Sequence, residues 1–146
     1  MLGVLPFVVK NCHLQVILLK ENFVGDAVAG RAIHVNAAQP VLRSYLHTDD
    51  LVKWLMVMVS DRRASGDIFN VGSPDVVSLQ YVAEVLAKHF KLGLKLASPD
   101  VEYRTIASKG YFPDVRKAKK LLDLEQSESS IEAVLRMAET IKKSQT

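Results

Sequence analysis

The sequence predicts an α/β or α+β fold, and three observations support that prediction. Short apolar stretches are interleaved with longer segments whose apolar residues recur every three to four positions, so strands and helices alternate along the chain. Helices that separate strands favour some parallel pairing. The chain has 146 residues, of which 49% are hydrophobic and 24% charged, and this is the size and balance of one globular domain.

The first half of that domain contains a short helix, two strands and a long helix. Residues 23–28 suit a short helix that stops at Gly30, because glycine is a favourable helix terminator. Strands are predicted over 32–35 and 43–47. A helix follows from Asp49, with Thr48 or Asp49 as its N-cap.

The helix that starts at Asp49 is apolar on nearly every side. Leu51, Trp54 and Met58 follow helical spacing, while Lys53 is the one charge in its interior. We therefore expect the protein, or a missing part of it, to cover this helix on more than one side.

The second half repeats the alternation. Residues 67–71 (DIFNV) suit a strand, and 72–75 suit a turn. Ser78 is the expected N-cap of an amphipathic helix that ends at Gly93. The remaining predictions are a strand at 94–97, a basic helix at 117–122 and a last helix from about Ser130.

Residues 1–20 form an apolar segment that we set apart from a domain at 21–146. Lys10, Asn11 and His13 interrupt it, so its runs are far shorter than the roughly 20 residues of a membrane helix. No basic stretch precedes it, which argues against a signal peptide. A buried strand or a partner-facing surface is the better interpretation.

Charge and cysteine content exclude some classes of partner. The 19 basic and 16 acidic residues are interspersed and the net charge is +3, so no nucleic-acid footprint and no membrane partner is predicted. Cys12 is the single cysteine, so an internal disulfide is impossible, and a reducing cytoplasm is the expected location.

Motifs of general chemistry are missing from the sequence. The four histidines lack metal-ligand spacing, so no metal site is expected. There is no Gly-x-Gly-x-x-Gly stretch, no phosphate loop and no Gly-x-Ser-x-Gly elbow. These patterns alone leave a globular domain of unknown activity.

Four stretches in order carry a resemblance to a known family. Residues 43–51 (RSYLHTDDL) follow the pattern Arg-x-aromatic-hydrophobic-His-x-x-Asp-hydrophobic. The other three are 22–35 (NFVGDAVAGRAIHV), 66–83 with GDIFNVGS and VSLQYVA, and 112–122 (FPDVRKAKKLL). Together they resemble the carboxy-terminal, substrate-binding part of extended short-chain dehydrogenases/reductases, the group of NAD-dependent nucleotide-sugar epimerases and dehydratases.

The resemblance implies a substrate lobe of an extended Rossmann-type enzyme that holds a nucleotide-diphosphate sugar. Asn22 matches a position that contacts the diphosphate or base side of the substrate, and Arg43 matches an arginine that contacts the diphosphate. Arg104 lies about where a second phosphate-binding arginine occurs. A guanidinium suits this task because it forms two parallel charge-assisted hydrogen bonds with phosphate oxygens.

Each of these assignments has a structural alternative. Asn22 is also a candidate N-cap, and Arg43 is a candidate for an ion pair with Asp49 or Asp50. The sequence after Arg104 lacks the Gly-Asp that the resemblance leads one to expect. Asn70 and Asp114 are expected to satisfy backbone groups at a turn and a helix start.

The resemblance also implies what this chain lacks. The family's cofactor fingerprint and its Tyr-x-x-x-Lys catalytic pair belong to an amino-terminal half, and none of the tyrosines here has a lysine four positions later. We therefore expect no cofactor in this chain, NAD or NADP in the parent enzyme, no catalytic residue here, and no turnover by the chain alone. The partners expected are a nucleotide-diphosphate sugar and either an amino-terminal half or a second copy. The alternative is a non-catalytic, self-associating module derived from the same scaffold.

Overall fold

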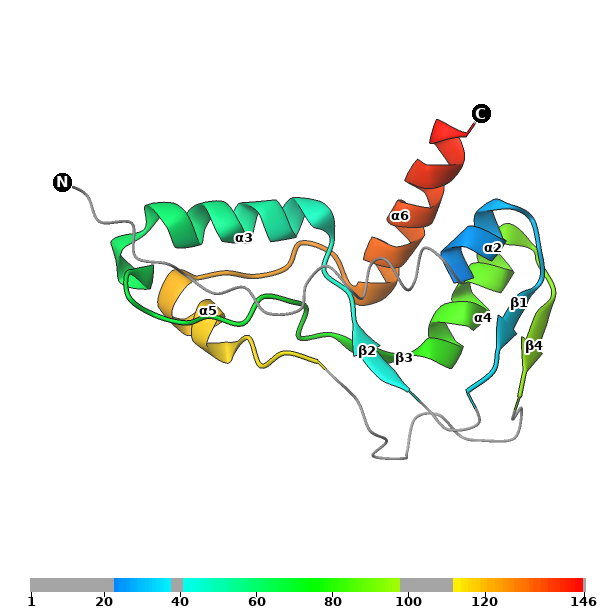
Figure 1. Cartoon of the computed structure of the whole chain (residues 1–146), viewed down its shortest axis with the longest axis horizontal. Coiled ribbons are helices and arrows are strands. Elements are labelled where there is room, and N and C mark those ends of the chain that lie inside the picture. Colours follow the sequence, from blue (N-terminus) through cyan, green and yellow to red (C-terminus); the bar gives the residue numbers. More distant parts are fainter. Residues whose placement is uncertain (1–22, 38–40, 98–111, 146) are drawn as a thin grey trace.

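Two hydrophobic clusters organise the protein. The computed structural model describes residues 23–37, 41–97 and 112–145. Figure 1 shows one group of elements around α4 and a second group under the long helix α3. The mixed α/β class predicted from the sequence is confirmed.

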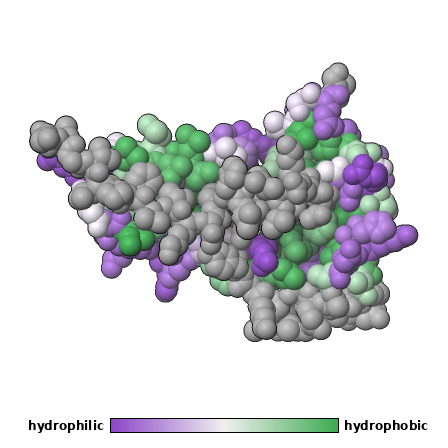
Figure 2. Space-filling model, viewed as in Figure 1, coloured by the Kyte–Doolittle hydropathy of each residue, from purple (hydrophilic) through white to green (hydrophobic). Residues whose placement is uncertain are grey.

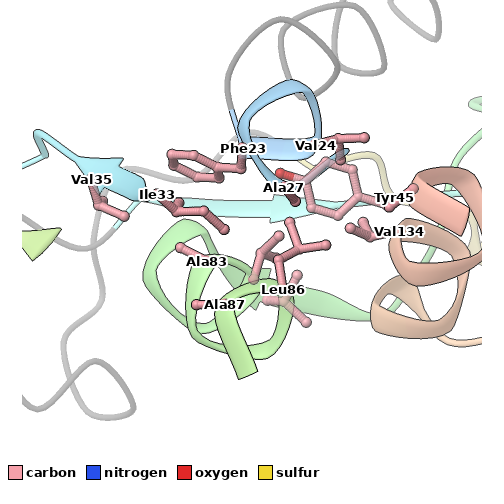
Figure 3. Packing of buried hydrophobic residues seen from close by; sticks show 13 residues of the cluster. Phe23, Val24, Ala27, Ile33, Val35, Tyr45, Ala83, Leu86, Ala87 and Val134 are labelled. Carbon is pink, nitrogen blue, oxygen red and sulfur yellow. The ribbon is translucent and has the colours of Figure 1, made fainter. Parts of the chain in front are cut away.

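The first cluster lies between helices and short strands. Its elements are α2 (Gly25–Val28), β1 (Ile33–Val35), β2 (Leu42–Ser44), β3 (Val76–Ser78), α4 (Leu79–Phe90), β4 (Leu94–Leu96) and α6 (Ser130–Ser144). Figure 3 shows Ile33 and Ala27 directed toward Leu86 of α4. The short helix and the strand predicted at 32–35 are both present. The helix ends near Gly30 as predicted, and φ of that glycine is +70°.

The strands form two separate pairs. β1 pairs with β4 in parallel, with Ile33 opposite Leu94. β2 pairs with β3 antiparallel, with Arg43 opposite Val77. The predicted parallel pairing is therefore confirmed, and it joins segments on either side of α4.

The second cluster packs beneath α3 (Thr48–Ser60). Its other elements are the 3-10 turn η2 (Arg62–Ala64) and α5 (Arg116–Leu122). Trp54 and Met58 are its buried residues from α3, and the Trp54 indole N–H donates to the carbonyl of Glu125 at 3.3 Å. Val52, Met56 and Val59 on the opposite face are exposed, so the rest of the described chain covers only one side of this helix.

Local capping explains where the helices begin and end. Ser78 caps α4 as predicted, since its Oγ accepts from the amide of Tyr81 at 3.1 Å. The predicted end at Gly93 is wrong, because Lys91 adopts the left-handed conformation (φ 56°) and ends the helix earlier. The carbonyl of Gly93 instead accepts from Ile33 at 2.9 Å, at the start of the parallel pair.

The structure corrects three other predictions. The N-cap of α3 is His47, whose Nδ1 accepts from the amide of Asp49 at 3.2 Å, rather than Thr48 or Asp49. The strand predicted at 43–47 ends at Ser44, because the next amide turns to a side chain of α6. No strand forms at 67–71: burial alternates there as in a strand, but no described strand lies beside it.

Candidate functional site

Arg43 lies at the centre of β2, so its backbone is fixed by the pairing with β3. The side chain is half-buried, and Nη1 donates a 2.7 Å hydrogen bond to the carbonyl of Leu42. In the part of the chain that the structure describes, no carboxylate forms an ion pair with this guanidinium. Because a guanidinium carries five N–H donors, most of its donors lack an acceptor among those residues.

The structural alternative for Arg43 does not hold for the two aspartates that suggested it. Asp49 is paired with Arg136, at 3.1 Å between Oδ2 and Nη2. Asp50 is buried and accepts from both the amide and the hydroxyl of Ser127, at 2.8 and 2.9 Å. Asp49 is thus committed to the middle of α6 and Asp50 to the segment before α6, not to Arg43.

Tyr45 follows Arg43 by two residues and lies in the first cluster. Figure 3 shows its ring between α2 and α6, next to Val134. Burial raises the pKa of the phenol, and the positive charge of Arg43 acts weakly in the opposite direction. The hydroxyl therefore stays protonated at neutral pH. Tyr45 is not among the predicted site residues, although it is the aromatic residue of the arginine-containing motif.

A pocket of about 360 Å³ opens where β2 leads into α3. One wall is the connection from Tyr45 to Asp49, and the other is a face of α6. The side chains from α6 are Ala133, Val134, Arg136, Met137, Thr140 and Ile141. The volume is at the lower end of those of small-molecule sites, and Arg43 lies two residues before the wall rather than in it.

The charged residues of the pocket neutralise one another. Arg136 pairs with Glu128 as well as with Asp49, and its pKa is raised mainly by the hydrogen bond to Glu128. His47 lies 3.5 Å from the Asp49 carboxylate. The charged groups that line the pocket are therefore paired with groups of opposite charge. The guanidinium of Arg43, by contrast, is paired with none of the described carboxylates.

Ser130 fixes the two walls of the pocket relative to each other. Its hydroxyl accepts from the amide of Tyr45 at 2.9 Å and lies 2.6 Å from the carbonyl of Asp75. Its own amide donates to the Asp75 carboxylate at 2.8 Å. The hydroxyl of Ser73 approaches it at 3.2 Å. The first residue of α6 is thereby tied to the end of β2 and to the turn before β3.

The other predicted site residues have mixed outcomes. Asn22 and Arg104 lie outside the described residues, so the structure tests neither their roles nor their distance from Arg43. Asn70 and Asp114 are structural as predicted: Asn70 Nδ2 donates to the carbonyl of Asp114 at 3.0 Å, and Asp114 Oδ1 accepts from the amide of Arg116 at the start of α5.

The described residues were compared with the requirements of a metal centre and of a dinucleotide site. The described histidines and carboxylates contain no group of three that could hold a metal ion. The connection from β2 to α3 and the junction of β3 with α4 both lack glycine, which a dinucleotide's phosphates require for close backbone approach. That this chain holds no cofactor stays a prediction. Among them, no helix has the length and apolarity to cross a membrane.

The sequence and the fold were compared with those of known proteins. No protein-family model matches the chain. A UDP-glucuronic acid decarboxylase from Arabidopsis thaliana is 28% identical over 110 residues, which are 72% of this chain and 29% of that protein. A dTDP-glucose 4,6-dehydratase from Bacillus anthracis, solved with NAD, aligns with a TM-score of 0.68 at 15% identity over 85% of this chain and 40% of its own. A UDP-glucuronic acid 4-epimerase from Bacillus cereus, solved with UDP-glucuronic acid and NAD, aligns with a TM-score of 0.69 at 13% identity, over 94% of this chain and 44% of its own.

The chain has the fold of part of an extended short-chain dehydrogenase/reductase of the NAD-dependent epimerase/dehydratase type. The resemblance inferred from the four motifs is confirmed at this level. The chain spans less than half the length of these structures, which agrees with the partial, carboxy-terminal match that the motif order predicts.

Proposed function

We propose that this chain is the nucleotide-diphosphate-sugar-binding portion of an NAD(P)-dependent nucleotide-sugar epimerase or dehydratase. One observation carries the proposal: a half-buried arginine, held on a paired strand, has no ion pair with a described carboxylate and precedes by two residues Tyr45, which lines a pocket. Such a guanidinium favours a diphosphate, because phosphate oxygens accept two parallel N–H bonds from it.

The binding of the diphosphate would serve to position the sugar. Binding energy from a part of the substrate that does not react can hold the reacting part in place for chemistry elsewhere. The cofactor would supply hydride transfer when bound to the other half of the enzyme. In this proposal the residues of the present chain bind and orient, and Asn22 and Arg104 assist Arg43.

Isothermal titration with a panel of UDP- and dTDP-sugars tests the proposal. We expect saturable binding to the wild-type chain and an affinity about 10- to 100-fold weaker for Arg43→Ala, the loss typical of hydrogen bonds to a charged group. Arg43→Lys keeps the charge but not the planar fork, so an intermediate affinity is expected.

Arg31→Ala is the matched control. This arginine is exposed and its guanidinium is paired with Asp26 at 2.8 Å, so the substitution should leave the affinity unchanged. Equal losses in Arg31→Ala and Arg43→Ala would show a general charge effect and contradict a site at Arg43. The absence of binding by every sugar would contradict the proposal as a whole.

The alternative function is a non-catalytic module that self-associates. The exposed residues of α3 favour it, because an uncovered apolar row favours a protein partner. A stable dimer with no affinity for any nucleotide sugar would support this alternative. Binding of a nucleotide sugar that depends on Arg43 would reject it as the sole function. A reducing cytoplasm remains part of either proposal.

A further inference from the structure

The pairing of β2 with β3 stops just before the next hydrogen-bonded pair of its register. Ahead of β2, the amide of Leu79 donates to the carbonyl of Val41 at 2.9 Å. Pairs that exchange backbone hydrogen bonds recur every two residues along antiparallel strands. The next such positions on the β2 side are therefore Arg43 and then Tyr45, and the residue opposite Tyr45 in this register is Asp75.

Two serine hydroxyls take the place of direct bonds between Tyr45 and Asp75. Ser130 Oγ accepts from the amide of Tyr45 at 2.9 Å and donates its one proton to the carbonyl of Asp75 at 2.6 Å. The amide of Asp75 donates to Ser73 Oγ at 2.9 Å. Both serines are 0% exposed. The inserted hydroxyls therefore hold the two strands apart at this pair, while both of its amides keep a partner.

The separation of the strands begins directly after Arg43. Val77 lies opposite Arg43 and belongs to the first cluster, as does Tyr45, so these three side chains share one side of the strand pair. From Tyr45 to Asp49 the chain forms one wall of the pocket. The guanidinium thus belongs to the last closed pair of the ladder, and the pocket wall starts at the first open one.

The lining of the pocket combines polar and apolar side chains. It includes the hydroxyl-bearing Thr48 and Thr140 and the apolar Leu46 and Met137. The hydrophobic atoms gathered over α3 in Figure 2 form a different, uniformly apolar surface. Apolar walls with a few polar groups are typical of small-molecule sites, and they suit the group that a nucleotide sugar carries on its diphosphate.

We propose that Ser130 is a positioning residue for the diphosphate site. Its hydroxyl keeps β2 and β3 apart after Arg43, so that the pocket stays open next to the guanidinium and receives the group attached to the diphosphate. Without this hydroxyl, the amide of Tyr45 and the carbonyl of Asp75 are free to bond directly, which draws the pocket wall toward the sheet. The inference rests on the proposed function, and it adds the residue that sets the spacing between the arginine and the pocket.

Titration of Ser130→Ala with two ligands tests the proposal. The ligands are the tightest-binding member of the panel of UDP- and dTDP-sugars, and inorganic pyrophosphate, which has no group for the pocket. We expect the affinity for the nucleotide sugar to fall about tenfold, because a small displacement of a binding wall is costly. The affinity for pyrophosphate should change less than about twofold, because Arg43 stays in a closed pair. Arg43→Ala should weaken the binding of both ligands.

Ser127→Ala is the matched control. It removes a hydroxyl that donates to the buried carboxylate of Asp50 at 2.9 Å, outside the strand pair, so neither affinity should change. Urea unfolding shows whether each variant is folded under the conditions of the titration. Where Ser130→Ala does not fold, Ser73→Ala removes the other hydroxyl of the opened pair and should show the same selective loss.

The outcomes separate this inference from the proposed function. An equal loss of affinity for the two ligands would show a general structural role of Ser130, and an unchanged affinity for the nucleotide sugar would show no role in binding. Either result overturns the inference even where Arg43→Ala confirms the site. A wild-type chain that fails to bind the two ligands, or one of them, contradicts the proposed function and this inference together.

Discussion

At the scale of single residues, Gly72 and Pro113 connect two of the four motifs. A Cβ built on Gly72 would overlap the ring of Pro113, with Cδ at 3.2 Å. Asn70 and Asp114 join the same two stretches by a hydrogen bond of 3.0 Å. The two motifs are therefore in direct contact, and glycine at position 72 is what lets the chain segments approach so closely.

Gly72→Ala should lower the free energy of unfolding by about 1–3 kcal/mol, the usual cost of overpacking, because the Pro113 ring cannot rotate away. Urea unfolding measures the change. Gly93→Ala is the control, since a Cβ there would meet Ala32 at an ordinary 3.5 Å. Pro113→Ala should restore part of the loss when combined with Gly72→Ala. Equal effects of the two glycine substitutions would contradict this explanation.

At the scale of elements, local patterns predicted the helices better than the strands. The helices that begin near Asp49, Ser78 and Ser130 are confirmed, since capping and apolar spacing lie within each segment. The strand at 67–71 is wrong because a strand needs a neighbour, and local spacing does not show whether the chain supplies one. The predicted end of the second strand at His47 is wrong for a similar reason: the strand ends at Ser44, because the hydroxyl of the distant Ser130 accepts from the amide of Tyr45.

In the candidate site, too, the residues of a local motif could be predicted and those brought in by tertiary contacts could not. Arg43 could be predicted because it belongs to a motif of consecutive residues. The wall that α6 contributes could not, because Arg136 and Met137 reach Tyr45 only after the chain has folded. The balance of charge at the pocket also depends on contacts between segments distant in sequence, such as the pair of Asp49 with Arg136.

The start of α5 should give the chain a stability contribution that depends on pH. Hydrogen bonds from Arg116 lower the pKa of Asp114 from its usual 3.8 to about 2. Because the pKa is lower in the folded state, the contribution is complete above about pH 4 and is lost as the pH falls toward 2. Urea midpoints at several pH values should fall more steeply for the wild type than for Asp114→Asn across this interval. Parallel curves would contradict the assignment.

At the scale of the whole molecule, polar contacts join the two hydrophobic clusters. Ser130 links β2, the turn before β3 and α6 on one side. Buried Asp50 ties α3 to Ser127, in the segment that leads into α6. These hydrogen bonds are buried or partly buried. Unfolding of one cluster alone would therefore leave polar groups of the other cluster without hydrogen-bond partners.

We therefore expect the clusters to unfold together. Trp54 is the sole tryptophan and lies in the second cluster, so its fluorescence reports on that cluster, while far-ultraviolet circular dichroism reports on all helices. The two urea transitions should coincide, as they do for one cooperative domain. A fluorescence transition at lower urea than the dichroism transition would show two separable units and contradict a single domain at 21–146.

The isolated chain should not turn over substrate. Its sequence has no Tyr-x-x-x-Lys pair and no Gly-rich dinucleotide turn. Incubation with NAD and a UDP-sugar, followed by chromatography of the nucleotide sugars, should therefore recover the sugar unchanged. A converted sugar in the absence of any other protein would contradict the view that the chemistry belongs to another half.

Phosphorus NMR of a UDP-sugar tests the central claim most directly, because it observes the diphosphate itself. Addition of the wild-type chain should shift or broaden both phosphorus resonances, and addition of Arg43→Ala should leave them near their free positions. Equal changes with the two proteins, or none with the wild type, would contradict a diphosphate site at Arg43.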